Sequence, residues 1–138
     1  MCIRDRRCSV RIEEDELKRA IGSMLETDGW IIRKMALRRE HGADIEATHD
    51  SLGNMTIEVK GEGTRNAMRV NYFLMVLGEL LQKMDGPNKQ YGIGLPAHKQ
   101  FANLIVRLPS WIKRYLKLKV FLVKKLDAKK YAVGYLCY

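Results

Sequence analysis

Two short segments of alternating apolar and charged residues, separated by a tight turn, constrain the fold of this chain more than any other feature. Residues 43–49 read ADIEATH and residues 55–61 read MTIEVKG. The five residues between them, DSLGN at 50–54, have the composition of a hairpin connection. Alternate residues of a strand share one face, so the apolar residues can pack against a helix while the charged residues gather opposite. The pattern predicts a β-hairpin with one charged face.

The rest of the chain predicts a series of helices and further strands. Residues 13–28 read as a helix, because apolar residues recur there every three or four positions and Gly29 follows as a stop. We expect strands at 30–37, 91–95, 120–123 and 131–136, helices at 71–85, 98–108 and 110–116, and a flexible connection at 61–70.

The resulting order is helix, three strands, helix and strand, followed by helical segments and one or two strands. Short connections favour an antiparallel meander for the first three strands. The strand after the second helix can join in parallel through that crossover. The sequence therefore predicts an α/β fold with a mixed central sheet flanked by helices, in a single domain over residues 9–138.

The N-terminus and the cysteines say little about function. Residues 1–8, MCIRDRRC, resemble the spurious leader that arises when sequencing-adapter DNA is translated, so we expect them to be non-native or disordered. They lack the apolar core of a secretory signal, and no apolar run approaches the roughly 18 residues of a membrane span. The three cysteines lack zinc-type spacing. These features favour a cytoplasmic protein with free thiols and no membrane partner.

Charge is distributed unevenly along the chain. Residues 1–88 hold 14 Lys/Arg against 15 Asp/Glu, whereas residues 89–138 hold 11 Lys/Arg against a single acid, Asp127. A basic C-terminal third suits a polyanionic partner, of which nucleic acid is the commonest. A basic surface that serves only solubility is the alternative.

An acid-x-Lys triplet in the hairpin gives the charged face a chemical interpretation. Glu58-Val59-Lys60 lies in a predicted central strand, follows the strand that carries Asp44, and precedes a helix. Acids and a lysine on one face can hold a divalent metal beside a cation, which suits metal-assisted phosphodiester hydrolysis. The triplet alone is a weak motif, and a solvated strand face is the alternative interpretation.

In this context the chain resembles the PD-(D/E)xK nuclease superfamily, and in general features its small Holliday-junction-resolvase-type members. The resemblance covers about residues 13–96: Asp44 matches the first acid, Glu58 the second and Lys60 the lysine, while Ala43 replaces the usual proline. It implies a restriction-endonuclease-like αβββαβ core. It also implies a Mg²⁺-dependent endonuclease, with Mn²⁺ able to substitute, that cuts DNA; branched DNA and RNA stay open as substrates, and a homodimer stays open.

The resemblance also implies roles for individual residues. Asp44 and Glu58 would bind Mg²⁺ through oxygens, with the Val59 carbonyl as a third ligand, since magnesium prefers oxygen ligands. Lys60 would orient or deprotonate the attacking water and offset phosphate charge. Gln82 of the second helix is a further catalytic candidate. A carboxylate of the first helix contributes in several family members, and the choice among three stays open: Glu13, Glu14 and Glu16.

Nucleic-acid contacts are expected from two groups of cations. Arg65 and Arg69 follow the motif, and a second basic patch lies further along the chain, at Lys113, Arg114, Lys117 and Lys119. Trp111 and Tyr115 beside this patch could stack on bases, although inward packing is the favoured interpretation of Trp111. Two alternatives to a nuclease remain: a non-catalytic nucleic-acid-binding module on the same fold, and a protein-interaction domain with a coincidental charged hairpin.

Overall fold

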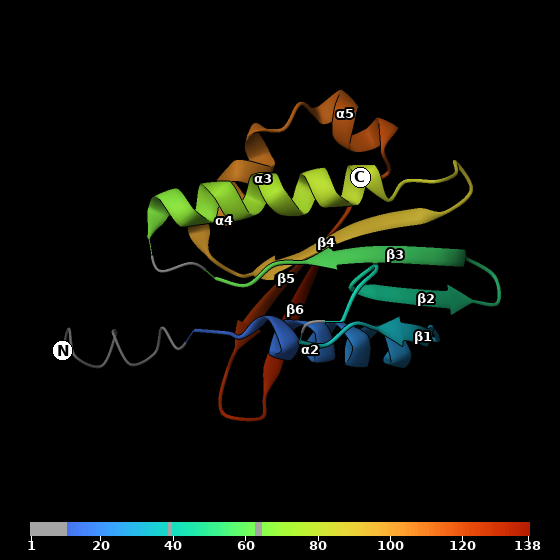
Figure 1. The fold of residues 1–138 in the computed structure, drawn as a ribbon, viewed down its shortest axis with the longest axis horizontal. Coiled ribbons are helices and arrows are strands. Elements are labelled where there is room, and N and C mark those ends of the chain that lie inside the picture. Colours follow the sequence, from blue (N-terminus) through green and yellow to red (C-terminus); the bar gives the residue numbers. More distant parts are fainter. Residues whose placement is uncertain (1–10, 39, 63–64) are drawn as a thin grey trace.

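Helices pack on both faces of a central sheet. The computed structural model describes residues 11–38, 40–62 and 65–138, and within these ranges it contains a single six-stranded mixed sheet (Figure 1). The N-terminal helix lies on one face of the sheet and the later helices lie on the other (Figure 1). Residues 1–8, for which a non-native leader is predicted, lie outside the described residues.

The order of elements confirms the predicted α/β fold with its αβββαβ core and C-terminal extension. In chain order the elements are α2 (Glu14–Thr27), β1 (Ile31–Met35), β2 (Ile45–His49), β3 (Gly53–Val59), α3 (Asn66–Gln82), β4 (Gln90–Pro96), α4 (Lys99–Arg107), α5 (Ser110–Tyr115), β5 (Lys119–Lys125) and β6 (Tyr131–Cys137). Each predicted helix and strand has its counterpart in this series.

Pairing of the first four strands follows the predicted topology. The strands lie in sequence order across the sheet, from β1 to β6. The pairs β1–β2 and β2–β3 are antiparallel, which confirms the meander, and β4 joins β3 in parallel through the α3 crossover. β5 is parallel to β4, and β6 pairs antiparallel with β5 at the edge of the sheet.

Strand alternation divides the core into two apolar layers. Ile57 and Val59 of β3 pack with α2 in one layer. Ile93 and Leu95 of β4 pack with α3 and α4 in the other. Because alternate residues of a strand point to opposite faces, Glu58 between Ile57 and Val59 faces away from α2, toward the α3 side of the sheet.

One boundary prediction is wrong. α3 begins at Asn66, not at residue 71, so much of the predicted flexible connection is helical, while residues 63 and 64 of it lie outside the described residues. The apolar periodicity that marks the rest of the helix is weak in its first turn. A tertiary contact compensates, since Arg69 Nη2 of that turn lies 3.3 Å from Glu62 Oε1.

In the ranges that the structure describes, no helix is both long and apolar enough to cross a membrane.

Candidate functional site

The hairpin register brings Asp44 and Glu58 together. Ile45 pairs with Ile57 across the antiparallel β2–β3 ladder, so Asp44 and Glu58, one step further out, lie opposite each other. The pKa of Glu58 is raised, first by burial and then by the nearby Asp44 carboxylate, so the two acids lie close together. The sheet thus places the two predicted metal ligands side by side.

Asp44 is held at both carboxylate oxygens. The backbone N–H of Val59 donates to Oδ2 at 2.7 Å, and Lys18 Nζ of α2 lies 3.1 Å from Oδ1. Lys18 is itself buried and also donates to the carbonyl of Ala36 at 2.6 Å. The orientation of Asp44 is therefore determined by its own hairpin partner and by a lysine from the N-terminal helix.

Glu58 is a buried acid with a lysine partner. Its relative exposure is 1%, and its Oε1 lies 2.6 Å from Lys83 Nζ, just past the end of α3. This short ion pair is the contact that compensates the burial of the carboxylate. Burial raises the pKa of Glu58 to about 7, with Asp44 adding to the rise and Lys83 opposing it.

Lys60 extends from the same strand face as Glu58, two residues further along. Its Nζ lies 5.2 Å from the centre of the Tyr72 ring of α3, a cation–π contact. Among the described residues no carboxylate lies within 4 Å of this ammonium. Lys60 and Tyr72 also line a polar hollow of about 250 Å³, together with Glu14. The predicted lysine is therefore beside open space and has no internal counter-ion in the described part of the chain.

The structure distinguishes the three acids of the first helix. Glu14 lies near the site, close enough to Lys60 and Lys18 for their charges to act on its carboxylate. Burial raises the pKa of Glu14, and the two lysine charges oppose this rise. Glu13 forms a capping box at the start of α2. Glu16 binds elsewhere, with one oxygen accepting from both Lys125 and Tyr131. Of the three acids, only Glu14 lies at the candidate site.

The α3 residue that touches the site differs from the one expected. Gln82 is exposed and forms no hydrogen bond with the described residues, whereas its neighbour Lys83 reaches Glu58. Glu79, one turn before Lys83, is close enough for its charge to raise the pKa of Glu14. A catalytic role for Gln82 stays a prediction.

Several predicted nucleic-acid contacts have different environments in the structure. Arg65 is exposed, whereas Arg69 is paired with Glu62. The prediction that Lys113 contacts phosphate is wrong, because this side chain is buried and donates to the carbonyl of Ile105 at 3.2 Å. Two members of the second basic patch are exposed, Arg114 and Lys117, whereas Lys119 is buried and donates to the carbonyl of Lys117 at 3.0 Å. The favoured inward packing of Trp111 is also wrong, since 63% of this residue is exposed.

Two residues of the site, Lys18 and Lys83, were not predicted from the sequence. Lys18 interrupts the apolar stripe of its helix, at three and seven residues before buried Ile21 and Leu25, and a charge at such a position was the available signal. Lys83 carried no comparable signal, because it follows the last helical turn and looks like an ordinary solvated cation. Both lysines pair with the predicted metal ligands.

The donor set suits magnesium in number and chemistry. Mg²⁺ in enzymes is often held by one or two carboxylates and retains water for its other positions. Asp44, Glu58 and the Val59 carbonyl would supply such oxygens, with Lys18 and Lys83 paired to the two carboxylates in this structure. In the described part of the chain, however, no three His, Cys, Asp or Glu side chains are grouped to hold a metal, so the protein itself offers no larger cage.

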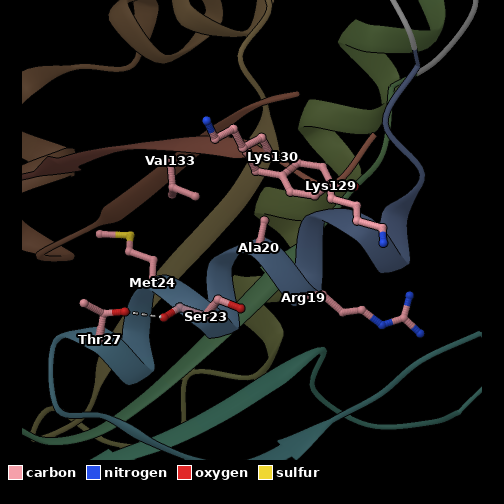
Figure 2. Close-up of a pocket in the computed structure, with 9 residues that line it drawn as sticks. Arg19, Ala20, Ser23, Met24, Thr27, Lys129, Lys130 and Val133 are labelled. Carbon is pink, nitrogen blue, oxygen red and sulfur yellow. Dashed lines mark hydrogen bonds between the residues drawn. The ribbon is translucent and has the colours of Figure 1, made fainter. Parts of the chain in front are cut away.

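A second hollow lies apart from these acids. It measures about 500 Å³ and lies between α2 and the β5–β6 hairpin, where Thr27 and Ser23 on the helix face Val133 on the strand (Figure 2). Thr27 Oγ1 donates to the carbonyl of Ser23 at 3.0 Å. No acid lines this hollow among the described residues, so it lacks the carboxylate pair that defines the candidate site.

Comparisons with known proteins identify no family. No family model matches the chain, and no curated protein matches it. Among solved structures, an XisH family protein from Nostoc punctiforme is similar over 77% of this chain and 88% of its own, with 17% sequence identity and a TM-score of 0.46. A likeness this distant carries no argument about family or activity.

Proposed function

We propose that this protein is a metal-dependent endonuclease of the PD-(D/E)xK type that hydrolyses DNA phosphodiester bonds. The observation that carries the proposal is the pairing of Asp44 with a buried Glu58, two residues before a lysine that has no carboxylate within 4 Å among the described residues. Burying one carboxylate beside another is costly, and proteins retain such groups mainly where function requires them.

Asp44, Glu58 and the Val59 carbonyl would hold Mg²⁺ or Mn²⁺. When bound, the metal would supply Lewis acidity toward the phosphate and would lower the pKa of water. Val59 N–H and Lys18 orient the Asp44 carboxylate, which limits the reorganisation that ligand binding requires.

Lys60 would act on the substrate side of the site. Its ammonium lies over Tyr72 beside a hollow of about 250 Å³ and has no carboxylate counter-ion among the described residues. A lysine in this state can neutralise a phosphate oxygen or orient the attacking water. Glu14 in the same hollow is placed to accept a proton from that water.

A non-catalytic nucleic-acid-binding module is the second candidate, and one observation favours it. Both predicted metal ligands already have ammonium partners, Lys18 for Asp44 and Lys83 for Glu58. In such a module the lysines would replace the metal permanently. In a nuclease, Lys83 would move aside, which its partly exposed side chain permits.

Cleavage of labelled linear, single-stranded and four-way-junction DNA with Mg²⁺ or Mn²⁺ tests the proposal. We expect cutting that EDTA abolishes and that Lys60→Ala removes, whereas Lys124→Ala, at an exposed lysine of β5, leaves it intact. Calorimetric titration with Mn²⁺ should show binding that Asp44→Asn weakens at least roughly tenfold. DNA binding without cutting on any substrate, and without Mn²⁺ binding, would instead identify the non-catalytic module.

A further inference from the structure

An apolar hollow lies between α3 and α5, on the outer side of the helical layer. It measures about 350 Å³, and the surface that its lining exposes is apolar. Leu77 and Leu81 of α3 form one wall, and Trp111, Ile112 and Tyr115 of α5 form the other. Soluble proteins rarely leave such a surface open without a partner.

Two aromatic side chains dominate this surface. Trp111 is 63% exposed and Tyr115 is 80% exposed, so most of each residue is in contact with water. The residues are four apart on α5, which places them on one face of the helix, one turn from each other. We call Trp111, Tyr115 and the apolar hollow beside them the α5 platform.

The platform is held in place from the opposite side of α5. Buried Lys113 donates to the carbonyl of Ile105 at 3.2 Å, and its Nζ lies 4.6 Å from the centre of the Tyr138 ring. These contacts tie α5 to α4 and to the C-terminal strand. With Lys113 turned inward, Trp111 and Tyr115 cannot both enter the core, so their exposure follows from how α5 is anchored.

Charge identifies the class of partner. Arg114 and Lys117 are exposed beside the aromatic residues, and Asp127 is the single acid of residues 89–138. A second copy of this chain would bring Arg114 and Lys117 of one platform against the same two cations of the other, which disfavours self-association here. The partner is therefore anionic and has flat apolar groups that fit against aromatic rings.

We infer that the α5 platform binds unpaired bases of single-stranded nucleic acid, by stacking them on Trp111 and Tyr115 while Arg114 and Lys117 contact phosphates. Exposed aromatic rings interspersed with cations are the usual equipment for this kind of binding. Bases in a duplex are stacked on each other and do not offer their faces, so the platform discriminates against duplex DNA. An acidic partner protein fits the charge but has no need for two exposed rings.

The choice of DNA as the nucleic acid rests on the proposed function. The inference narrows the substrate of that nuclease to DNA with an unpaired segment. α3 links the two surfaces: Lys83 at its end reaches Glu58, while Leu77 and Leu81 of the same helix line the hollow. The diameter of one helix, about 10 Å, separates its two sides, so a strand of a few nucleotides could reach from one surface to the other.

Fluorescence of Trp111 tests the stacking directly, in EDTA so that no cleavage intervenes. The chain has two tryptophans, and Trp30 is buried, so Trp30→Phe leaves Trp111 as the reporter. We expect oligothymidine to quench this fluorescence strongly, and an abasic oligonucleotide of equal length and charge to quench it weakly. Quenching by polyglutamate but not by oligothymidine would overturn the inference and identify a site for acidic proteins.

Affinities measured with labelled oligonucleotides on the otherwise native chain give a second test. Trp111→Ala and Tyr115→Ala should each weaken oligothymidine binding by roughly tenfold, leave abasic binding nearly unchanged, and leave the circular dichroism spectrum intact. Leu126→Ala, at a 56% exposed residue outside the hollow, is the matched control. Equal losses on the abasic probe would overturn stacking.

The two proposals fail in distinguishable ways. Absence of cleavage in Mg²⁺ with normal quenching would reject the nuclease and keep the platform. Cleavage that is lost with Lys60→Ala but is unaffected by Trp111→Ala and Tyr115→Ala, together with no quenching, would reject the platform and keep the nuclease.

Discussion

Lys83 Nζ lies 2.6 Å from Oε1 of Glu58, and this ion pair joins the end of α3 to the end of β3. The two partners are in different environments, since the Lys83 side chain is 34% exposed and that of Glu58 is 1% exposed. The pair therefore lies where the protein interior meets solvent. Glu58 is the buried partner, so its charge depends on Lys83 for compensation.

Removing Lys83 should destabilise the protein. Lys83→Met leaves a buried carboxylate without its cation, and we expect the free energy of unfolding near neutral pH to fall by about 1–2 kcal/mol, less than for a fully buried pair. Urea denaturation measures the change. Lys89→Met is the matched control, because its pair with Asp85 is exposed and screened by solvent, so this variant should lose less stability than Lys83→Met. Equal losses in the two variants would contradict a special role for Lys83.

Stability should fall as the pH rises through the range in which Glu58 titrates. Its pKa is raised from an ordinary 4.5 to about 7, so the folded state holds a proton that the unfolded state has released between these values. The contribution is complete below about pH 4.5 and is lost by about pH 7. Glu58→Gln should flatten this dependence in thermal melts. The loss caused by Lys83→Met should also shrink toward acid pH.

Lys18 should matter more for folding than its charge suggests. It is buried with Asp44, so Lys18→Met should cost about 3 kcal/mol by leaving Asp44 Oδ1 without its cation. Combining it with Asp44→Asn should recover a large part of this loss, because the uncompensated charge is then absent. Chemical denaturation of the four proteins in this cycle measures the coupling. Purely additive losses would show that the two side chains do not interact.

Glu16 should make the protein sensitive to acid. Hydrogen bonds from Lys125 and Tyr131 lower the pKa of Glu16 to about 2, so its contribution is present above about pH 4.5 and is lost as the pH falls toward 2. Glu16→Gln should cost about 1–2 kcal/mol at neutral pH and little in strong acid. Tyr131→Phe, which keeps Lys125, should give a smaller loss; denaturation at several pH values separates these cases.

Two glycines should respond to alanine with opposite signs. A Cβ at Gly94 would lie 2.4 Å from Ile21 Cδ1 and 3.1 Å from Val59 Cγ2, so Gly94→Ala should cost about 1–3 kcal/mol. A Cβ at Gly78 meets nothing within 4 Å, and in the middle of α3 the change to alanine should stabilise by about 0.5–1 kcal/mol. Melting temperatures of the two variants provide the comparison, and a destabilised Gly78→Ala would contradict it.

Local patterns were sufficient to predict most of the fold. Alternation in the hairpin placed Ile57 and Val59 on one face and Glu58 on the other, and helical periodicity located α2 and most of α3. These predictions succeed because the period of a strand or helix depends on neighbouring residues only. The start of α3 was missed, since there a contact between Arg69 and Glu62 supplements a weak local pattern.

The sequence by itself determined the element order and the pairing of the first four strands, because short connections favour antiparallel neighbours and a helical crossover allows a parallel one. The hairpin register needed the structure: the predicted connection of residues 50–54 would place Asp44 opposite Lys60, whereas His49 pairs with Gly53 and Asp44 lies opposite Glu58. Tertiary structure alone decided the partners of these acids. Lys18 comes from α2 and Lys83 from the C-terminal end of α3, so no local spacing in the sequence predicts either ion pair. It also decided that Lys113 is buried while Trp111 is exposed, because the anchoring of α5 depends on where α4 and the C-terminal strand pack.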